Sequence, residues 1–305
     1  MNVLITGGAG FVGSHLTDAL AADHTVSVLD NFSSGSRKNL HPSTEVVEGD
    51  IRDERRLDKL VRDAEVVFHQ AASVSVDRSI ANPTASHAIN VDATLSLLEA
   101  ARKHDARCVL ASSAAIYGQP AGVPISETAS KSPESPYGIE KLSVDQYARV
   151  YNDLYGLPTV ALRYFNIYGP RQTAGDYSGV ISVFLGQARN GEPITIHGDG
   201  SQTRDFVHVS DVVQANLLAM STKNVGEAYN IATGRPVTIE ALARMVKRVT
   251  NSNSEIVHTT GRDGDIDESC GNIEKAHRQL GYEPMISLED GLPTLVSRPS
   301  VSNVR

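Results

Sequence analysis

The sequence is poor in cysteine, in basic charge and in long apolar runs, and it contains no tryptophan. Its two cysteines, Cys108 and Cys270, are too few for a disulfide framework or a cysteine metal site, so a reducing cytoplasm is expected and no metal is predicted. The formal net charge of −8 argues against a nucleic-acid partner, whose binding surface is normally basic. No apolar run approaches the roughly 18 residues that span a bilayer, so no membrane partner is expected. The N-terminus lacks the basic start of a signal peptide.

The first informative feature of the sequence is a glycine-rich turn near the N-terminus. The short apolar run "NVLIT" at 2–6 indicates a buried strand, and it is followed by Gly7, Gly10 and Gly13 and then by a helical pattern. At a strand-to-helix turn these glycines permit a tight turn, a close approach of backbone to a pyrophosphate, and close packing of the helix on its strand. The spacing predicts a dinucleotide-binding site.

The second predicted strand, "TVSVLD", ends in Asp30, 17 residues after Gly13. A carboxylate at this point can accept hydrogen bonds from an adenosine ribose and would repel a 2′-phosphate. This favours NAD over NADP. Arg37 is close enough in sequence to leave NADP open.

Strand-like and helical segments then alternate. Strands are predicted at 44–49, 65–69, 107–112 and 159–164, and helices near 54–62, 84–103 and 136–155. This order is typical of an α/β fold with a doubly wound parallel sheet of Rossmann type. Ligands of such sheets bind outside the carboxyl ends of the strands. Asp50, His69, Ser112, Ser113 and Tyr164 fall at or just past those ends, although a hydrogen-bonded core histidine is the favoured interpretation of His69.

Tyr137 and Lys141 occur in the segment "SPYGIEK", four residues apart. If a helix begins near Pro136, the two side chains share one face. A tyrosine with a pKa near ~10 is a poor base at neutral pH, and a neighbouring cation favours its phenolate. Ser113 follows a predicted strand, so the topology can bring its hydroxyl to the same substrate oxygen.

Several longer segments resemble one family. "TGGAGFVGSH", "GDIRD", "SSAAIYG", "PYGIEK", "LRYFNIYGPRQ" and "GRDGDIDES" are similar to the extended short-chain dehydrogenase/reductases and, within them, to the UDP-glucose 4-epimerase family. The resemblance extends from the first residues to about Pro284. It implies NAD as cofactor, a UDP-sugar as substrate, a transient 4-keto sugar and a homodimer. The family's catalytic Ser or Thr directly precedes the "AAIYG"-type segment, which implies Ser113 rather than Ser112, and the latter is expected to be a structural turn residue.

The same resemblance implies the remaining site residues. The catalytic set is Ser113, Tyr137 and Lys141. The expected cofactor contacts are Gly7, Gly10, Phe11, Val12, Gly13, Asp30, Asn31, Asp50, Ile51, Gln70, Ala71, Ala72, Asn90, Tyr137, Lys141 and Tyr164. The expected substrate contacts are Ser113, Tyr137, Asn166, Val180, Arg204, Arg262, Asp265 and Ser269, with both arginines and Asn166 on the diphosphate, Asp265 at the ribose, and Arg171 structural.

Two departures from the family pattern bear on the reaction. Many epimerases have a lysine where this chain has Val74, so one cofactor contact is absent or supplied by another group. No acidic residue follows Ser113, as it does in related dehydratases and decarboxylases, and this favours epimerisation. A UDP-glucuronate or other nucleotide-sugar 4-epimerase and a nucleotide-sugar reductase remain alternatives. A non-enzymatic NAD sensor is a further one.

The position that Ser269 matches in the family lines the pocket near the sugar C2 substituent. A tyrosine there narrows the pocket to glucose and galactose, so a serine implies room for an N-acetyl group. The alternative is that Ser269 only caps the turn before a helix starting near Asn272.

The expected organisation is an NAD-binding domain at 1–165, to which 206–231 return, and a smaller α+β lobe for the nucleotide sugar at 166–205 and 232–305. The homodimer is expected to pair the helices near 84–103 and 136–155.

Overall fold

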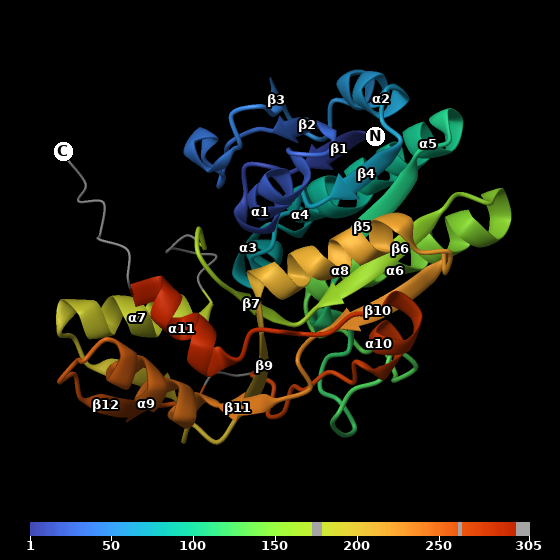
Figure 1. Ribbon diagram of the computed structural model, residues 1–305. Coiled ribbons are helices and arrows are strands. Elements are labelled where there is room, and N and C mark those ends of the chain that lie inside the picture. The colour runs from blue at the N-terminus through green and yellow to red at the C-terminus, as the bar shows by residue number, and fades with distance from the viewer. Residues whose placement is uncertain (173–178, 262–263, 297–305) are drawn as a thin grey trace.

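The computed structural model describes residues 1–172, 179–261 and 264–296. Its larger lobe is built on a seven-stranded parallel sheet (Figure 1). The strands lie in the order β3-β2-β1-β4-β5-β6-β10. They are β1 (Asn2–Thr6), β2 (Thr25–Asp30), β3 (Glu45–Glu48), β4 (Val66–His69), β5 (Arg107–Ser113), β6 (Thr159–Tyr164) and β10 (Glu227–Ile231). The predicted doubly wound sheet of Rossmann type is confirmed.

Both faces of this sheet are buried, which explains why its strands have near-continuous apolar sequences. In β1, Val3 and Ile5 belong to one hydrophobic core and Leu4 to the other. The first core is covered by α1 (Phe11–Leu20) and α8 (Val209–Ser221). The second is covered by α2 (Glu54–Arg62), α5 (Ala93–His104) and α6 (Pro136–Tyr155).

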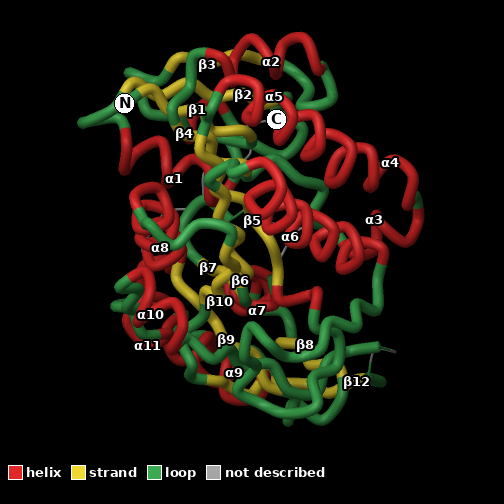
Figure 2. The backbone as a smooth tube through the Cα atoms, turned by 90° about the vertical axis from the view of Figure 1, so that its right-hand side faces the viewer, coloured by secondary structure: helices red, strands yellow, loops and turns green. Residues whose placement is uncertain are grey.

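The direction of winding reverses between β1 and β4. From β1 the sheet extends through β2 to β3 on one side, and through β4, β5, β6 and β10 on the other, from the top of Figure 2 to below its centre. A crevice opens outside the carboxyl ends of the strands at such a reversal. The fold therefore places the glycine turn after β1 and the ends of β4 and β5 around one opening.

The helix expected near 84–103 differs in the structure. It consists of α4 (Pro83–His87), a π-helical turn η2 (Ala88–Asp92) and α5. Pro83 occupies the start of α4, and Asn82 caps it by accepting from Ala85 N at 3.1 Å. The short α3 (Val76–Ala81) precedes it.

The start of α6 agrees with the sequence. Ser135 is its N-cap and accepts from Gly138 N at 3.1 Å, and Pro136 fills the first turn, where no backbone donor is needed.

The smaller lobe occupies the lower part of Figure 1. Its core lies among α7 (Val180–Asn190), α9 (Ile239–Val249) and α11 (Leu288–Val296), together with β8 (Ile194–His197) paired to β12 (Ile256–Thr259). A three-stranded sheet of β7 (Asn166–Tyr168), β9 (Thr203–His208) and β11 (Pro236–Thr238) joins it to the larger lobe.

The chain passes between the lobes more than once. It leaves the large sheet after β6, returns through β9 into α8 and β10, and leaves again into β11. The helix α10 (Glu274–Leu280) contributes Ala276 and Leu280 to the core of the larger lobe, although the sequence-based division assigns 232–305 to the smaller one. Within the described ranges, no helix has the length and apolar character to cross a membrane.

Candidate active site

A cavity of about 470 Å³ opens at the carboxyl ends of the parallel strands. The expected cofactor and catalytic residues line it with a single exception, Asn90. The lining includes Gly7, Gly10, Phe11, Val12, Gly13, Asp30, Asn31, Asp50, Ile51, Gln70, Ala71, Ala72, Ser113, Tyr137, Lys141 and Tyr164. Residues from Gly7 to Gln172 thus converge on one opening.

The glycine turn forms one wall of the cavity. Gly7 has φ +68°, and a Cβ on it would lie 2.6 Å from the backbone nitrogen of Ala71. A Cβ on Gly13 would lie 2.2 Å from Gly7 O. The N-cap of α1 is Gly10, which offers no side-chain cap, so backbone N–H groups of the first turn are available to an anion in the cavity. This cradle fits the pyrophosphate of a dinucleotide.

Asp30 stands at the end of β2 and is 8% exposed. Its Oδ2 accepts from Ala9 N at 2.9 Å and its Oδ1 from Phe32 N at 2.7 Å, which orients the carboxylate in the cavity wall. Arg37, the cation that could attract a 2′-phosphate, is paired with Glu48 and stacks 4.5 Å over the ring of Phe32. The local charges therefore favour a ribose with a free 2′-hydroxyl.

Asp50 lies at the same end of the cavity. Arg52 donates to both of its oxygens, at 2.9 and 2.7 Å, and lowers the pKa of the Asp50 carboxyl to about 2. Ser33, Ser34 and Asn39 also line the cavity and were missed in the sequence. The polar turn "NFSSGS" directly after Asp30 was the available signal.

Gln70 and Tyr164 meet across the cavity floor. Gln70 Nε2 lies 3.2 Å from the Tyr164 hydroxyl, and Asn216 Nδ2 donates to that hydroxyl at 2.8 Å. Asn216 is fully buried on α8, so the returning segment supports the cavity from behind. It was missed in the sequence, where an amide in the apolar stretch "VVQANLLAM" was the only signal.

Ser113, Tyr137 and Lys141 come together on the other wall. Ser113 is the last residue of β5, and, against the rise that burial causes, its side chain lowers the pKa of the Tyr137 phenol. Tyr137 and Lys141 stand one turn apart on α6, with Lys141 Nζ 6.0 Å from the centre of the tyrosine ring. Lys141 Nζ also donates to Ala111 O at 2.9 Å, which fixes the ammonium against β5.

Burial pushes both ionisable groups toward their neutral forms. It raises the pKa of Tyr137 to about 12, against the opposing hydrogen bond from Ser113. It lowers the pKa of Lys141 to about 8. The phenolate therefore depends on positive charge nearby, from Lys141 and from an oxidised nicotinamide when the cofactor is bound.

Two residues near these walls, His69 and Asn90, do not line the cavity. His69 is buried in the core, with Nδ1 2.7 Å from Thr6 Oγ1 and Nε2 2.8 Å from Thr94 Oγ1, and burial lowers its pKa to about 3. It is the core histidine that the sequence analysis favoured. Asn90 is 2% exposed and binds the backbone of Ser73 through both ends of its amide, behind the cavity loop.

Ser112 lines the cavity as a strand residue of β5, and not as a turn residue. Its Oγ is buried without a hydrogen-bond partner in the described part of the chain.

Three of the expected substrate residues of the smaller lobe lie together at the start of β9. Arg204 forms an ion pair with Asp265 and donates to Thr203 O at 2.8 Å. Ser269 is 6% exposed, and its backbone nitrogen donates to the same Thr203 O at 3.2 Å. Asn166 and Val180 are the first residues of β7 and α7. None of these five residues lines the cofactor cavity formed by the described residues. The predicted contact at Arg262 lies outside the described residues.

Arg171 and Val74 lie at the mouth of the cavity. Arg171 has φ +68° and docks the connection after β7 onto α1, donating to Ser14 O at 3.0 Å and to Asp18 Oδ2 at 2.6 Å. Arg171 therefore has the expected structural role, because it holds this connection on α1, and it also lines the cavity. Val74 presents an exposed apolar side chain where many epimerases have a lysine.

Comparison with known proteins agrees with this geometry. The model of the NAD dependent epimerase/dehydratase family matches residues 3–232. A putative UDP-glucose 4-epimerase of Methanocaldococcus jannaschii is 40% identical over 299 residues, which cover 97% of each chain. The crystal structure of UDP-glucose 4-epimerase from Thermotoga maritima with UDP-glucose has a TM-score of 0.94 at 41% identity and covers 97% of each chain.

A UDP-N-acetylglucosamine 4-epimerase from Methanobrevibacter ruminantium, in complex with UDP-N-acetylmuramic acid, has a TM-score of 0.93 at 36% identity and covers 97% of this chain and 96% of its own. The family resemblance predicted from the motifs is confirmed. With a dinucleotide cradle and a Ser–Tyr–Lys set on one cavity, the chain belongs to the NAD-dependent epimerase/dehydratase family of extended short-chain dehydrogenase/reductases and is a nucleotide-sugar epimerase.

Proposed function

We propose that this epimerase inverts C4 of UDP-hexoses, interconverting UDP-glucose and UDP-galactose, with the N-acetyl forms as further substrates. The observation that carries the proposal is the assembly of Ser113, Tyr137 and Lys141 on one wall of the cofactor cavity. Relatives that act on UDP-glucose and on UDP-N-acetylglucosamine support it.

The chemistry assigned to the chain is a proton transfer at one sugar oxygen. The Ser113 hydroxyl and the Tyr137 phenolate hold the C4 hydroxyl, and Tyr137 accepts its proton as the C4 hydride leaves. A bound NAD⁺, held by the glycine turn, Asp30 and Lys141, would supply reversible hydride acceptance at C4. The 4-keto sugar turns about its diphosphate link and presents its opposite face, after which Tyr137 gives the proton back. Lys141 keeps positive charge beside the phenolate throughout.

The diphosphate is assigned to the smaller lobe. Arg204 is mostly buried and already paired with Asp265, so its guanidinium is oriented before a ligand arrives. Planar guanidinium groups bind phosphate oxygens through paired hydrogen bonds. We assign Asn166, Val180 and Arg262, the last of which is outside the described residues, to the same ligand, and Asp265 to its ribose.

The sugar pocket is assigned to Ser269. Its burial and its backbone bond to Thr203 place it beside Arg204, on the lobe that we assign to the diphosphate. A hydroxymethyl side chain leaves more volume than a phenol. This supports a pocket that accepts a C2 N-acetyl group.

A simple product analysis tests the proposal. Purified protein incubated with UDP-glucose and only trace NAD should form UDP-galactose, resolved by chromatography, with no net change in NADH absorbance. Consumption of stoichiometric NADH would identify a reductase, and turnover of UDP-glucuronate alone would identify the acidic-sugar epimerase. Binding of NAD without turnover of any UDP-sugar would indicate a non-enzymatic NAD sensor.

A further inference from the structure

A buried carboxylate stands beside the catalytic pair. Glu140 lies on α6 between Tyr137 and Lys141 and is 2% exposed. As the third residue after Tyr137, it shares that side of the helix. Burying a carboxylate is costly unless hydrogen bonds satisfy it. The buried carboxylate of Glu140 is therefore expected to have a function.

The carboxylate is satisfied by neutral donors on the neighbouring helix. Its Oε2 accepts from Ser86 Oγ at 2.8 Å and from Asn90 Nδ2 at 2.6 Å. Asn90 lies in the π-helical turn η2, and such turns are frequent at functional sites. The irregular turn thus brings an amide to Glu140.

The contact continues into the cavity wall. Asn90 Oδ1 accepts from Ser73 N at 2.8 Å, and its Nδ2 donates to Ser73 O at 2.9 Å. Ser73 follows directly on Gln70, Ala71 and Ala72 in the loop that lines the cofactor cavity. Glu140 therefore connects the helix that carries the base with the loop that faces the cofactor.

Glu140 is also the charge that acts on both catalytic groups. Its negative charge raises the pKa of Lys141, which burial lowers, and adds to the rise that burial causes in the pKa of Tyr137. His69 on β4 is uncharged at neutral pH, because burial and then the charge of Lys141 lower its pKa to about 3.

The ion pairs on the elements packed against α6 include Arg163 of β6 with Asp145 of α6 itself, His87 of α4 with Asp92 of η2, Glu99 with Arg102 of α5, Lys103 and His104 of α5 with Asp58, and Glu227 of β10 with Lys275. Asp77 and Arg78 of α3 are exposed, and Arg107 of β5 donates to the backbone oxygens of Ala219 and Thr222.

We propose that Glu140 is a positioning residue of the epimerase: its buried carboxylate ties the catalytic helix to the cofactor loop through Asn90, and its charge keeps Lys141 protonated beside Tyr137. This inference rests on the proposed 4-epimerase activity. The carboxylate also has an unfavourable effect, because the same charge makes the Tyr137 phenolate harder to form.

Glu140→Gln separates the two roles. One amide oxygen can accept from both Ser86 and Asn90, so the hydrogen bonds are kept while the charge is removed. Loss of a negative charge destabilises the ammonium and favours the phenolate. The acid and alkaline limbs of the kcat/KM profile should therefore both move to lower pH, by about one unit. Glu134→Gln, an exposed carboxylate three residues before Tyr137, is the matched control and should leave both limbs in place.

Glu140→Asp gives the complementary result. It keeps the charge but shortens the side chain, so the limbs should stay near those of the wild type while NAD dissociates faster. If both limbs of the Glu140→Gln profile coincide with those of the wild type, the charge role is wrong. It is also wrong if Glu140→Asp shifts the limbs as much as Glu140→Gln does. Unchanged NAD dissociation in Glu140→Asp would overturn the tie to the loop.

A readout without turnover separates this inference from the proposed function. The tyrosinate absorbance of NAD-loaded protein, minus that of the same protein carrying Tyr137→Phe, reports ionisation of Tyr137 alone. Glu140→Gln should lower the midpoint, even if no UDP-sugar is epimerised. An unchanged midpoint contradicts the inference, whereas a shifted midpoint without epimerisation contradicts only the proposed function.

Discussion

At the scale of single residues, the site depends on groups held away from their ordinary ionisation. Burial raises the pKa of Tyr137 and lowers that of Lys141, so it disfavours both the phenolate and the ammonium. The hydrogen bond from Ser113 offsets part of the shift in Tyr137. Positive charge near Tyr137, from Lys141 and from an oxidised nicotinamide, would favour its phenolate.

Tyr137→Phe is the direct test of the base. The substitution removes only the ionisable oxygen, so the fold and NAD binding should be preserved while kcat falls by about 10²- to 10⁴-fold. Steady-state assay of UDP-galactose formation measures the loss, and circular dichroism with NAD titration controls for folding. Wild-type turnover in this variant would refute the assignment of Tyr137.

Asp30 should make the protein select NAD over NADP. Its carboxylate lines the cavity, and Arg37 is occupied by Glu48 and Phe32, so a 2′-phosphate meets negative charge without a free partner from this arginine. We expect NAD to bind at least about tenfold more tightly, which corresponds to ~1.4 kcal/mol. Calorimetry with both cofactors measures the ratio. Equal affinities would show that Arg37 exchanges partners.

Ser269→Tyr should narrow the sugar pocket. A ring in place of a hydroxymethyl group should suppress turnover of UDP-N-acetylglucosamine and spare UDP-glucose, because steric exclusion of one substituent is worth about 1–3 kcal/mol. Ser269→Ala is the matched control and should keep both activities. Absence of N-acetyl activity in the wild type, or equal handling of both sugars by the tyrosine variant, would leave Ser269 as a turn residue.

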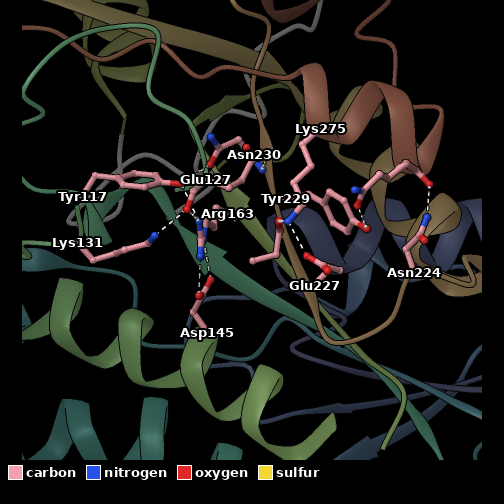
Figure 3. A network of polar contacts seen from close by, with 12 residues as sticks. Tyr117, Glu127, Lys131, Asp145, Arg163, Asn224, Glu227, Tyr229, Asn230 and Lys275 are labelled. Atoms are coloured by element: carbon pink, nitrogen blue, oxygen red, sulfur yellow. Dashed lines mark hydrogen bonds and ion pairs between the residues drawn. The ribbon is translucent and has the colours of Figure 1, made fainter. Parts of the chain in front are cut away.

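At the scale of elements, a buried ion pair holds the catalytic helix on the sheet. Arg163 of β6 donates to both oxygens of Asp145 on α6, at 2.8 Å each, and to the Tyr117 hydroxyl at 2.9 Å (Figure 3). Tyr117 lies four residues after Ser113 and donates to Asn230 of β10 at 2.6 Å. One network thus joins the helix of Tyr137 and Lys141, the turn after Ser113, and the last strand of the sheet.

Asp145→Asn should destabilise the protein strongly. It leaves the Arg163 guanidinium buried without a counter-charge, and breaking a buried pair in this way costs about 3–5 kcal/mol. Chemical denaturation should show a lower midpoint, with a loss of turnover in native conditions that follows displacement of α6. Asp153→Asn removes an exposed partner of Arg149 on the same helix and should change stability little.

Elements with a strong local pattern could be predicted from the sequence, and the interruption at η2 could not. The buried strands have apolar runs, and Ser135 and Pro136 mark the start of α6. The segment 84–103 has a continuous helical pattern, yet Asn90 sits in a π-helical turn because its amide binds Glu140 and Ser73. Those partners lie 50 and 17 residues away, so no local signal reports them.

At the scale of the whole molecule, the two halves of the site differ in how far the sequence predicts them. The cofactor half follows from topology, because parallel strands end at one edge and carry Gly7, Asp30 and Ser113 there. The sugar half depends on pairings between distant segments, such as Arg204 with Asp265 across 61 residues. The family motifs identified these residues, while their contact with each other appears only in the fold.

The last prediction concerns assembly. Ile139, Val150 and Leu154 are spaced by 11 and 4 residues on one side of α6, and Ile139 and Leu154 are 55% and 68% exposed. An apolar stripe on the side of α6 that faces away from the sheet is suited to pairing with a second copy of the helix, so we expect a homodimer, with α5 beside α6 in the interface. Analytical ultracentrifugation at micromolar concentration should give twice the chain mass of 32.7 kDa.

Leu154→Glu should shift the dimer toward monomer, because it places a charge in the apolar contact. Met285→Glu is the matched control: Met285 is 72% exposed and lies between α10 and α11, outside the proposed interface. A wild-type protein that remains monomeric refutes the dimer. If both glutamate variants keep the dimer mass, the subunits pair through a surface other than α6, and the stripe on this helix needs another partner.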